Sequence, residues 1–392
     1  MNLSELTSAQ ALRSAVHLEP IDGPGGRIYP PTYPAAEGSA DKRARHAIET
    51  LPNGQQRVLI DSLASQANRQ EAALVAARDA GLINFSDIYV DLAGTEAAAD
   101  RQLLSATEMP HRLSDAILRD SEIDGVPFGR SELGRRILSA TATDLSAILE
   151  TSPTTILFGC WFSQHGLSRP LKIQRSITSE IWADDAILGK AVGSRIDPLG
   201  IEKLQLYEAR DGDWTALEEK AVQRQNKPKP FHKKRPSEIN HGNIAPDIRD
   251  HGITATAVTL RWAMPLAAVR RLHFGGGVLD QAGQAYVVAL GVLARVLDHA
   301  AGYSLRSRCD LIGSGPIKVD VIDGDGAITG HVLTKDSALT LLHQAEDGMR
   351  NAGLKLHQKI MAKPSQKLID LIAANRRRQD LDGDGSDEEA SA

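Results

Sequence analysis

The sequence holds little cysteine and few aromatic residues. Only two of its 392 residues are cysteine, Cys160 and Cys309, too few for a disulfide framework or a zinc clip of paired cysteines. Aromatic residues make up 4% of the chain, which is low for a protein that stacks single-stranded bases on aromatic side chains. If the chain binds nucleic acid, we expect it to do so mainly through phosphates and shape.

A long apolar segment and a targeting segment are also missing. The longest apolar run, residues 285–294, ends at Arg295 and is about half as long as a membrane-spanning helix requires. The first ten residues, MNLSELTSAQ, have neither the basic nor the apolar region of a signal peptide. We therefore expect a reduced, cytoplasmic protein without a membrane partner.

Sequence patterns of common catalytic sites are absent as well. The chain has no GxxxxGK[ST], no GxGxxG after a strand and no HExxH. His111 and Asp115 could seed a metal or acid–base site, but helix capping and surface ion pairing explain their spacing better. The loop Gly275–Gly277 could hold an anion ahead of a helix, or form a simple turn. We expect no catalytic residue, no metal and no cofactor.

The net charge of −5 conceals two basic clusters. The last fourteen residues carry six acidic residues and no basic one, and without these six charges −5 becomes +1. One cluster is the proline-containing segment 223–236, which has no acid and no helical period. We expect a mobile loop there that contacts a phosphate backbone through Lys233, Lys234 and Arg235, with a solvated linker as an equal alternative. The other cluster includes Lys355, Lys359, Lys363 and Lys367, whose spacing of four predicts one stripe of a helix.

The order of predicted elements indicates an α+β fold. Residues 57–61 and 154–161 are predicted as buried strands, and 171–181 as a protruding hairpin. Strand–helix–strand followed by strand–helix–hairpin predicts a split βαβ, ferredoxin-like core with large insertions. The predicted organisation is an irregular segment at 1–56, an RRM-like palm at 57–350, a basic helix at 351–378 and an acidic disordered tail at 379–392. Within the palm we expect a helical finger region at about 100–150, a thumb-like arm at 165–182 and a basic loop at 221–250.

Six segments between residues 23 and 320 carry more specific patterns. They are GPGGRIYPPTYP, VLIDSLASQANRQEAAL, PHRLSDAILRDS, ILFGCWFS, SRIDPLGI and LRSRCDLI. Together they resemble the RAMP-superfamily backbone subunits of type I-U (also called I-G) CRISPR effector complexes. The segments IDSxxSQANR and SRIDPLGI are the most specific, whereas the basic loop and the acidic tail lie outside the pattern.

The resemblance implies a RAMP fold, an RRM-like palm with finger and thumb insertions, and a non-catalytic role in antiviral defence. Copies would polymerise head to tail along a CRISPR guide RNA, beside other effector subunits. Each copy would hold the guide by phosphates and shape while the bases pair with target DNA. The implied RNA-binding residues are Ser65, Gln66, Asn68 and Arg69 on the helix after residues 57–61, Lys172 and Arg175 on the thumb-like arm, Arg195 in SRIDPLGI, and Arg27.

Two other hypotheses remain open at this stage. A metal-dependent, RNA-cleaving backbone subunit would hold a divalent ion at Asp61, although the sequence offers no second ligand nearby. An RNA-independent protein-interaction module would use the basic loop and the acidic tail to pair with neighbouring subunits.

Overall fold

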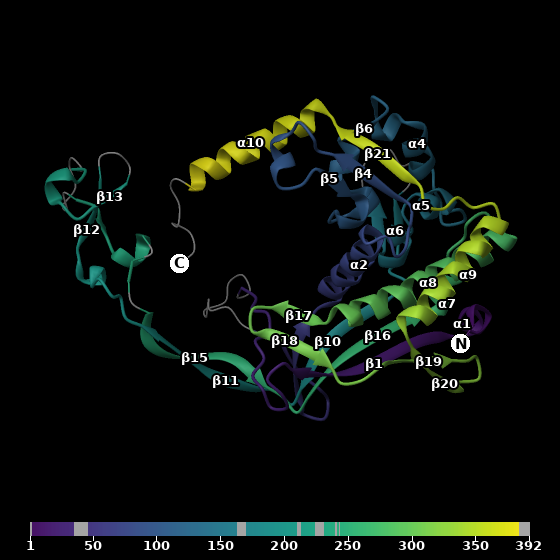
Figure 1. Cartoon of the computed structure of the whole chain (residues 1–392), viewed down its shortest axis with the longest axis horizontal. Coiled ribbons are helices and arrows are strands. Elements are labelled where there is room, and N and C mark those ends of the chain that lie inside the picture. Colours follow the sequence, from purple (N-terminus) through teal and green to yellow (C-terminus); the bar gives the residue numbers. More distant parts are fainter. Residues whose placement is uncertain are drawn as a thin grey trace. The chain divides into compact units, whose positions relative to one another are not determined.

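The computed structural model describes residues 2–34, 46–162, 170–209, 213–223, 231–239, 241–242 and 244–383. The chain divides into two compact units (Figure 1). Unit 1 comprises Met1–Ile187 and Ile253–Ala373, and unit 2 comprises Leu188–Gly252 and Ala374–Ala392.

Unit 1 is built on an antiparallel sheet. Its central strands follow the order β18 (Cys309–Gly313), β1 (Ala11–Pro20), β16 (Ala257–Pro265) and β10 (Thr178–Asp184). Numbered along the chain, this is the order 4-1-3-2 of a ferredoxin-like sheet, which confirms the predicted α+β palm. Further strands extend the two edges: β3 (Gln56–Asp61) and β2 (Ile48–Thr50) beyond β10, and β17 (Tyr303–Arg306), β19 (Ile317–Ile322) and β20 (Ile328–Leu333) near β18 and β1.

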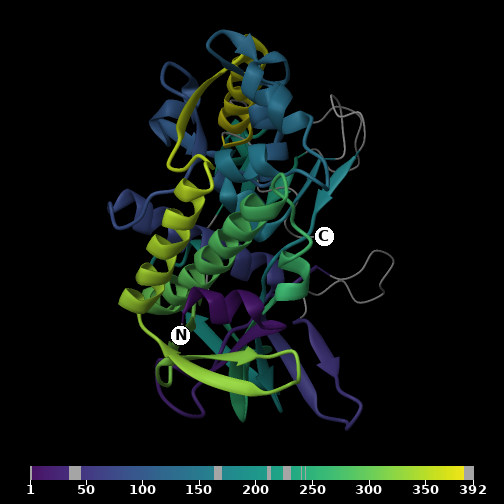
Figure 2. The ribbon, with the colours of Figure 1, turned by 90° about the vertical axis from the view of Figure 1, so that its right-hand side faces the viewer.

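Helices α2 (Leu63–Asp79) and α8 (Gly277–Ala301) cover one face of this sheet, and α9 (Lys335–Asn351) packs on α8 (Figure 2). Strand β1 shows why: Leu12, Val16 and Leu18 are buried, and Arg13 and His17 between them are exposed. Helix α8 is long and apolar enough to cross a membrane, but 56% of its most apolar window is buried inside the fold, as in the core helix of a globular domain. Two short helices, α1 (Leu3–Ser8) and α7 (Leu266–Val269), complete this part of unit 1.

The first strand of the palm is β1, which corrects the irregular segment expected at 1–56. Polar and apolar residues alternate along Ala11–Pro20, which is typical of a strand. The irregular segment was predicted for the whole of 1–56 from the glycine- and proline-rich residues that follow this strand. The strand predicted at 57–61 exists as β3, outside β10. Helix α2 therefore follows an inserted hairpin instead of the first palm strand.

A second, smaller sheet forms the finger part of unit 1. Its strands follow the order β5 (Leu103–Ser105), β4 (Asp87–Asp91), β21 (Lys359–Pro364), β6 (Ser121–Ile123) and β7 (Val126–Pro127). Four short helices accompany it: α3 (Ala116–Arg119), α4 (Glu132–Leu138), α5 (Ser146–Thr151) and α6 (Pro153–Phe158). The expected helical region at 100–150 is therefore mixed. Residues 154–161 are also not one strand, because α6 occupies most of them before β8 (Cys160–Phe162) begins.

The two predicted insertions at 165–182 and 221–250 are organised differently from expectation. Within 165–182, β9 (Leu171–Ile173) pairs with β8, and β10 is a palm strand, so the described part of this range is no protruding arm. A long ribbon is instead formed by β11 (Ile187–Arg195) and β15 (Ile244–Thr254), so 221–250 is not simply a loop. Unit 2 also contains the small sheet of β12 (Leu206–Glu208), β13 (Trp214–Thr215) and β14 (Lys233–Lys234).

The C-terminal region is a strand followed by a helix, which corrects the single basic helix expected at 351–378. Lys359 and Lys363 lie on β21, and Lys367 lies on α10 (Gln366–Gly383), so the four lysines do not share one helix stripe. Helix α10 also includes residues 379–383 of the expected disordered tail; the remaining tail residues lie outside the described residues.

Candidate nucleic-acid interface

The polar segment of α2 points mainly into the protein. Gln66 is fully buried: its Nε2 donates to Asp61 Oδ2 at 2.8 Å, and its Oε1 accepts from Ser179 Oγ at 2.9 Å. Arg69 donates from Nε to Asp61 Oδ2 at 2.9 Å and from Nη2 to the carbonyl oxygen of Leu305 at 2.8 Å. These two side chains join α2 to the palm. Gln66 has no exposed surface to offer RNA, whereas the Arg69 side chain is 28% exposed and its contact with RNA stays a prediction.

Asp61 is the centre of this buried network. Besides Gln66 and Arg69, it accepts from Arg306 Nη2 at 3.0 Å through its other oxygen. Both carboxylate oxygens are thus engaged by cationic or amide donors, an arrangement unsuited to a divalent cation. No group of three or more metal-ligating side chains occurs in the described part of the chain. The Asp61 metal-site hypothesis therefore loses its support.

The other two residues of the α2 segment are accessible to different extents. Asn68 is exposed and Ser65 is half-buried, its backbone N–H donating to the N-cap side chain of Ser62 at 3.3 Å. Their contact with RNA stays a prediction.

Three cations meet at a hollow of about 260 Å³ beside β9. Lys172, Arg175 and Arg271 line it, and all three side chains are exposed. Its other lining residues are mainly apolar side chains and backbone, including Leu145 and Leu171. We call this site the basic hollow. Lys172 and Arg175 were predicted from the sequence, whereas Arg271 was not, because it comes from a distant part of the chain, just after α7.

The charges at the basic hollow are not neutralised locally. None of its three cations forms an ion pair within the described part of the chain. The carboxyl of Glu71, on which the charge of Arg175 acts, is held in an ion pair by Arg112. Burial raises the pKa of Glu71, and the positive charges of Arg112 and Arg175 oppose that rise. Cations without carboxylate partners around a small hollow are suited to phosphate.

The segment that carries Lys172 and Arg175 is held firmly. Gly159 has a φ of +81°, and a Cβ there would meet the backbone of Arg175 at 2.9 Å, so the chain approach requires glycine. The backbone N–H of Ser176 donates to the carbonyl oxygen of Leu157 at 2.9 Å. These contacts hold the chain after β9 against the end of α6. Lys172 and Arg175 are therefore already in position before a ligand binds.

The open face of the palm sheet differs from the basic hollow because its arginines form ion pairs. Its arginines are paired with acids: Arg13 with Asp320 at 3.2 Å, Arg57 with Glu49 at 2.7 Å and Arg261 with Asp184 at 3.7 Å. Arg57 also stacks over the ring of Trp182. This face is charge-balanced, although an RRM-like palm could suggest that RNA lies across it.

The remaining predicted contacts are scattered. Arg27 is exposed in the N-terminal segment, and the side chain of Arg195 lies outside the described residues. On β14, Lys233 is exposed and Lys234 half-buried, whereas Arg235 pairs with Glu238 at 3.0 Å. Arg195, Lys233, Lys234 and Arg235 belong to unit 2, and Arg27 does not line the basic hollow. Among the predicted residues whose side chains the structure describes, Lys172 and Arg175 line the hollow, while Gln66 and Arg69 meet at Asp61.

Two other sequence motifs have structural explanations. Asp280 Oδ1 accepts from the backbone N–H groups of Phe274 and Gly276, and Oδ2 contacts His273 at 2.7 Å, so this carboxylate already occupies the glycine-rich loop. Asp115 accepts from the backbone N–H groups of His111 and Ile117, which confirms helix capping as its role.

Comparison with known proteins finds one family model that is similar to the N-terminal part of the chain. Residues 12–187, a little under half of the chain, match the family model described as CRISPR-associated protein GSU0053 (Cas_GSU0053). Over these residues the chain is similar to a CRISPR-associated family. The match covers β1, the α2 segment and the strands β8 and β9, and it agrees with the resemblance seen in the sequence.

Solved structures include a chain from a "CRISPR RNA-guided surveillance complex, pre-nicking". It is 12% identical, the alignment covers 93% of this chain and 99% of that chain, and the TM-score is 0.29. No curated relative matches the chain. The chain itself combines a ferredoxin-like palm with the basic hollow beside β9.

Proposed function

We propose that this CRISPR effector subunit is a non-catalytic, cytoplasmic backbone that binds guide RNA by its phosphates. The observation that carries the proposal is the basic hollow, where Lys172, Arg175 and Arg271 have no carboxylate partner in the described part of the chain. A cation that is free of intramolecular pairing can release a counterion when it contacts a phosphate, which is the main source of affinity for nucleic acid.

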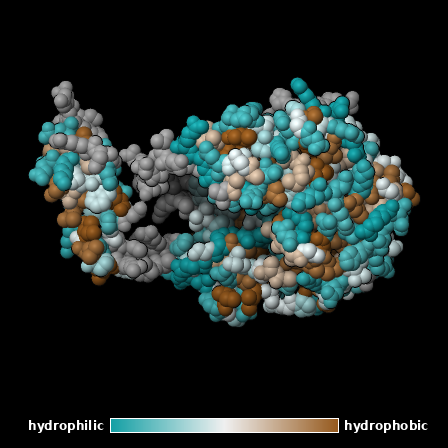
Figure 3. Space-filling model, turned by 45° about the horizontal axis from the view of Figure 1, so that its top comes forward, coloured by the Kyte–Doolittle hydropathy of each residue, from teal (hydrophilic) through white to brown (hydrophobic). Residues whose placement is uncertain are grey.

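Polymerisation along the guide completes the proposal. A head-to-tail contact between identical copies is heterologous and generates an open filament, which suits a linear RNA. Unit 2 supports this because apolar side chains lie on its surface (brown on the smaller body in Figure 3). Ile196 is 80% exposed and Leu199 is 78% exposed. Other effector subunits would cap the filament, and target DNA would be recognised by pairing with the guide.

The salt dependence of RNA binding tests the basic hollow. We expect the double variant Arg175→Gln/Arg271→Gln to flatten the slope of log K against log salt by about 1.4, at roughly 0.7 per lost phosphate contact on a single strand. The slope is measured by titrating the full chain with single-stranded RNA at several salt concentrations.

Arg261→Gln is the matched control for this experiment. The side chain of Arg261 is 54% exposed, so it is accessible to solvent, but unlike the cations of the basic hollow it is paired with Asp184. We expect its slope to equal that of the wild type. An unchanged slope in the double variant would contradict the proposed function.

A further inference from the structure

Trp161 is unusually exposed for a tryptophan. Its relative exposure is 63%, more than any other aromatic side chain in the described part of the chain. It lies on β8 directly opposite Lys172 of β9, and opposed residues of an antiparallel pair place their side chains next to each other on one face. Trp161 therefore stands beside a cation of the basic hollow.

The residues on either side of Trp161 fix its position. Cys160 and Phe162 are buried at 9% and 4% exposure, so the alternation of the strand directs Trp161 away from the core. The carbonyl oxygen of Gly159 accepts from Arg112 Nη1 at 3.0 Å, and the Cys160 thiol donates to Ser114 Oγ at 3.2 Å. Because the backbone on either side of Trp161 is already fixed, a ligand that covers the ring does not have to order the strand.

We propose that Trp161 stacks against a nucleobase of a strand whose phosphates occupy the basic hollow. The inference rests on the proposed function and deepens it: the ligand is a single strand with an accessible base, because the bases of a duplex are already stacked on each other. Lys172, Arg175 and Arg271 contact phosphates, which are the same whatever the base sequence of the strand. Trp161 adds a contact that requires a base but tolerates any of them, since every base has a π-face.

An abasic ligand separates the base contact from the phosphate contact. The full chain is titrated with a short oligouridylate and with an abasic oligonucleotide of the same length. We expect Trp161→Ala to weaken binding of the oligouridylate by about 5- to 150-fold and to leave binding of the abasic strand unchanged. The salt slope of this variant stays at the wild-type value because no charge is removed.

Trp161→Phe is the matched control, since it keeps an aromatic face. We expect it to retain most of the affinity for oligouridylate but to lose the quenching of tryptophan fluorescence that accompanies binding in the wild type. Equal weakening of both ligands in Trp161→Ala would overturn the inference in favour of a structural role. Unchanged affinity for both ligands, with altered self-association, would overturn it in favour of a protein contact.

The two proposals fail differently. If Arg175→Gln/Arg271→Gln keeps the wild-type salt slope, the basic hollow does not bind phosphate and the proposed function fails. If that slope flattens while Trp161→Ala binds both strands normally, only the stacking role of Trp161 fails.

Discussion

Asp61 holds three structural elements together through one carboxylate. It lies at the end of β3, is fully shielded from solvent, and contacts Gln66 and Arg69 on α2 and Arg306 on β17. A buried carboxylate is stable only when its charge is balanced and its lone pairs are occupied, and these donors do both. Asp61, Gln66 and Arg69 of the segment IDSxxSQANR therefore have a structural role: they join β3, α2 and β17.

Removing the carboxylate should destabilise the protein strongly. Asp61→Ala leaves two partly buried guanidinium groups without their acid, and we expect a loss of about 3–5 kcal/mol in the free energy of unfolding. Asn68→Ala, on the exposed face of the same helix, is the control and should change stability by less than about 0.5 kcal/mol. Urea denaturation followed by circular dichroism gives both values. Equal stability of the wild type and Asp61→Ala would refute this role of the network.

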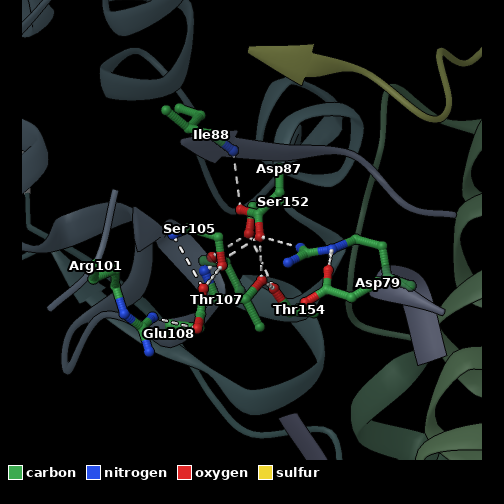
Figure 4. Close-up of polar contacts among 11 residues, drawn as sticks. Asp79, Asp87, Ile88, Arg101, Ser105, Thr107, Glu108, Ser152 and Thr154 are labelled. Atoms are coloured by element: carbon green, nitrogen blue, oxygen red, sulfur yellow. Dashed lines mark hydrogen bonds and ion pairs between the residues drawn. The ribbon is translucent and has the colours of Figure 1, made fainter. Parts of the chain in front are cut away.

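Two other buried carboxyls make stability depend on pH. Burial raises the pKa of Asp87 to about 6, although Thr107 Oγ1 donates to it at 2.6 Å and Arg78 pairs with it at 3.1 Å (Figure 4). Burial likewise raises the pKa of Asp298 to about 6. A carboxyl with a raised pKa binds its proton more tightly in the folded state. Its contribution to the free energy of unfolding therefore increases as the pH falls through 6 toward 4.

The test compares denaturation at about pH 7 and about pH 5. We expect Asp87→Asn/Asp298→Asn to lose most of the stabilisation on acidification that these two carboxyls give the wild type. The quantity measured is the difference in urea midpoint between the two pH values for each protein. The same difference in the double variant and the wild type would show that neither carboxyl titrates in this range.

At the scale of elements, neither a short apolar run nor a regular spacing of charges was enough to determine the type of element. The apolar run at 154–161 was assigned to a strand, but Pro153 and Gly159 bound a one-turn-and-a-half helix, and a short apolar run alone does not separate the two. The lysines spaced by four suggested a helix. Solvated charges need no regular spacing, and the buried side chain of Ala362, followed by Pro364 at the strand end, marks the strand β21 instead.

The candidate site shows the same limit. Lys172 and Arg175 could be predicted because they are close in sequence and lie in a basic segment. Arg271 joins them only because α7 packs at the end of β16, a tertiary contact that no local pattern encodes. The family resemblance implies that Gln66 and Arg69 contact RNA. Both side chains also bond to the buried carboxylate of Asp61, and the burial of that carboxylate is known only from the fold.

At the scale of the whole molecule, unit 2 has the features of a docking element. The segment SRIDPLGI contains a tight turn in which Asp197 Oδ1 accepts from the backbone N–H of Leu199 at 2.9 Å and Oδ2 accepts from that of Glu202 at 3.1 Å. These backbone hydrogen bonds lower the pKa of Asp197. Gly200 completes the turn with a φ of +67°. A rigid turn that leaves Ile196 and Leu199 exposed is explained if a second copy covers them.

Assembly on RNA tests this interpretation. Leu199→Glu places a charge where the proposed contact with the next copy would bury an apolar side chain, and burial of an unpaired charge is strongly unfavourable. We therefore expect single-copy complexes on a long RNA in place of multimers, measured by particle mass before and after RNase.

Leu199→Met keeps the apolar contact and should assemble as the wild type does. The salt slope per bound copy should be the same in all three proteins, because Leu199 contacts no phosphate. If Leu199→Glu formed RNA-dependent multimers of wild-type mass, the contact between copies would have to lie elsewhere. RNase-resistant multimers of the wild type would instead show that protein contacts alone sustain assembly.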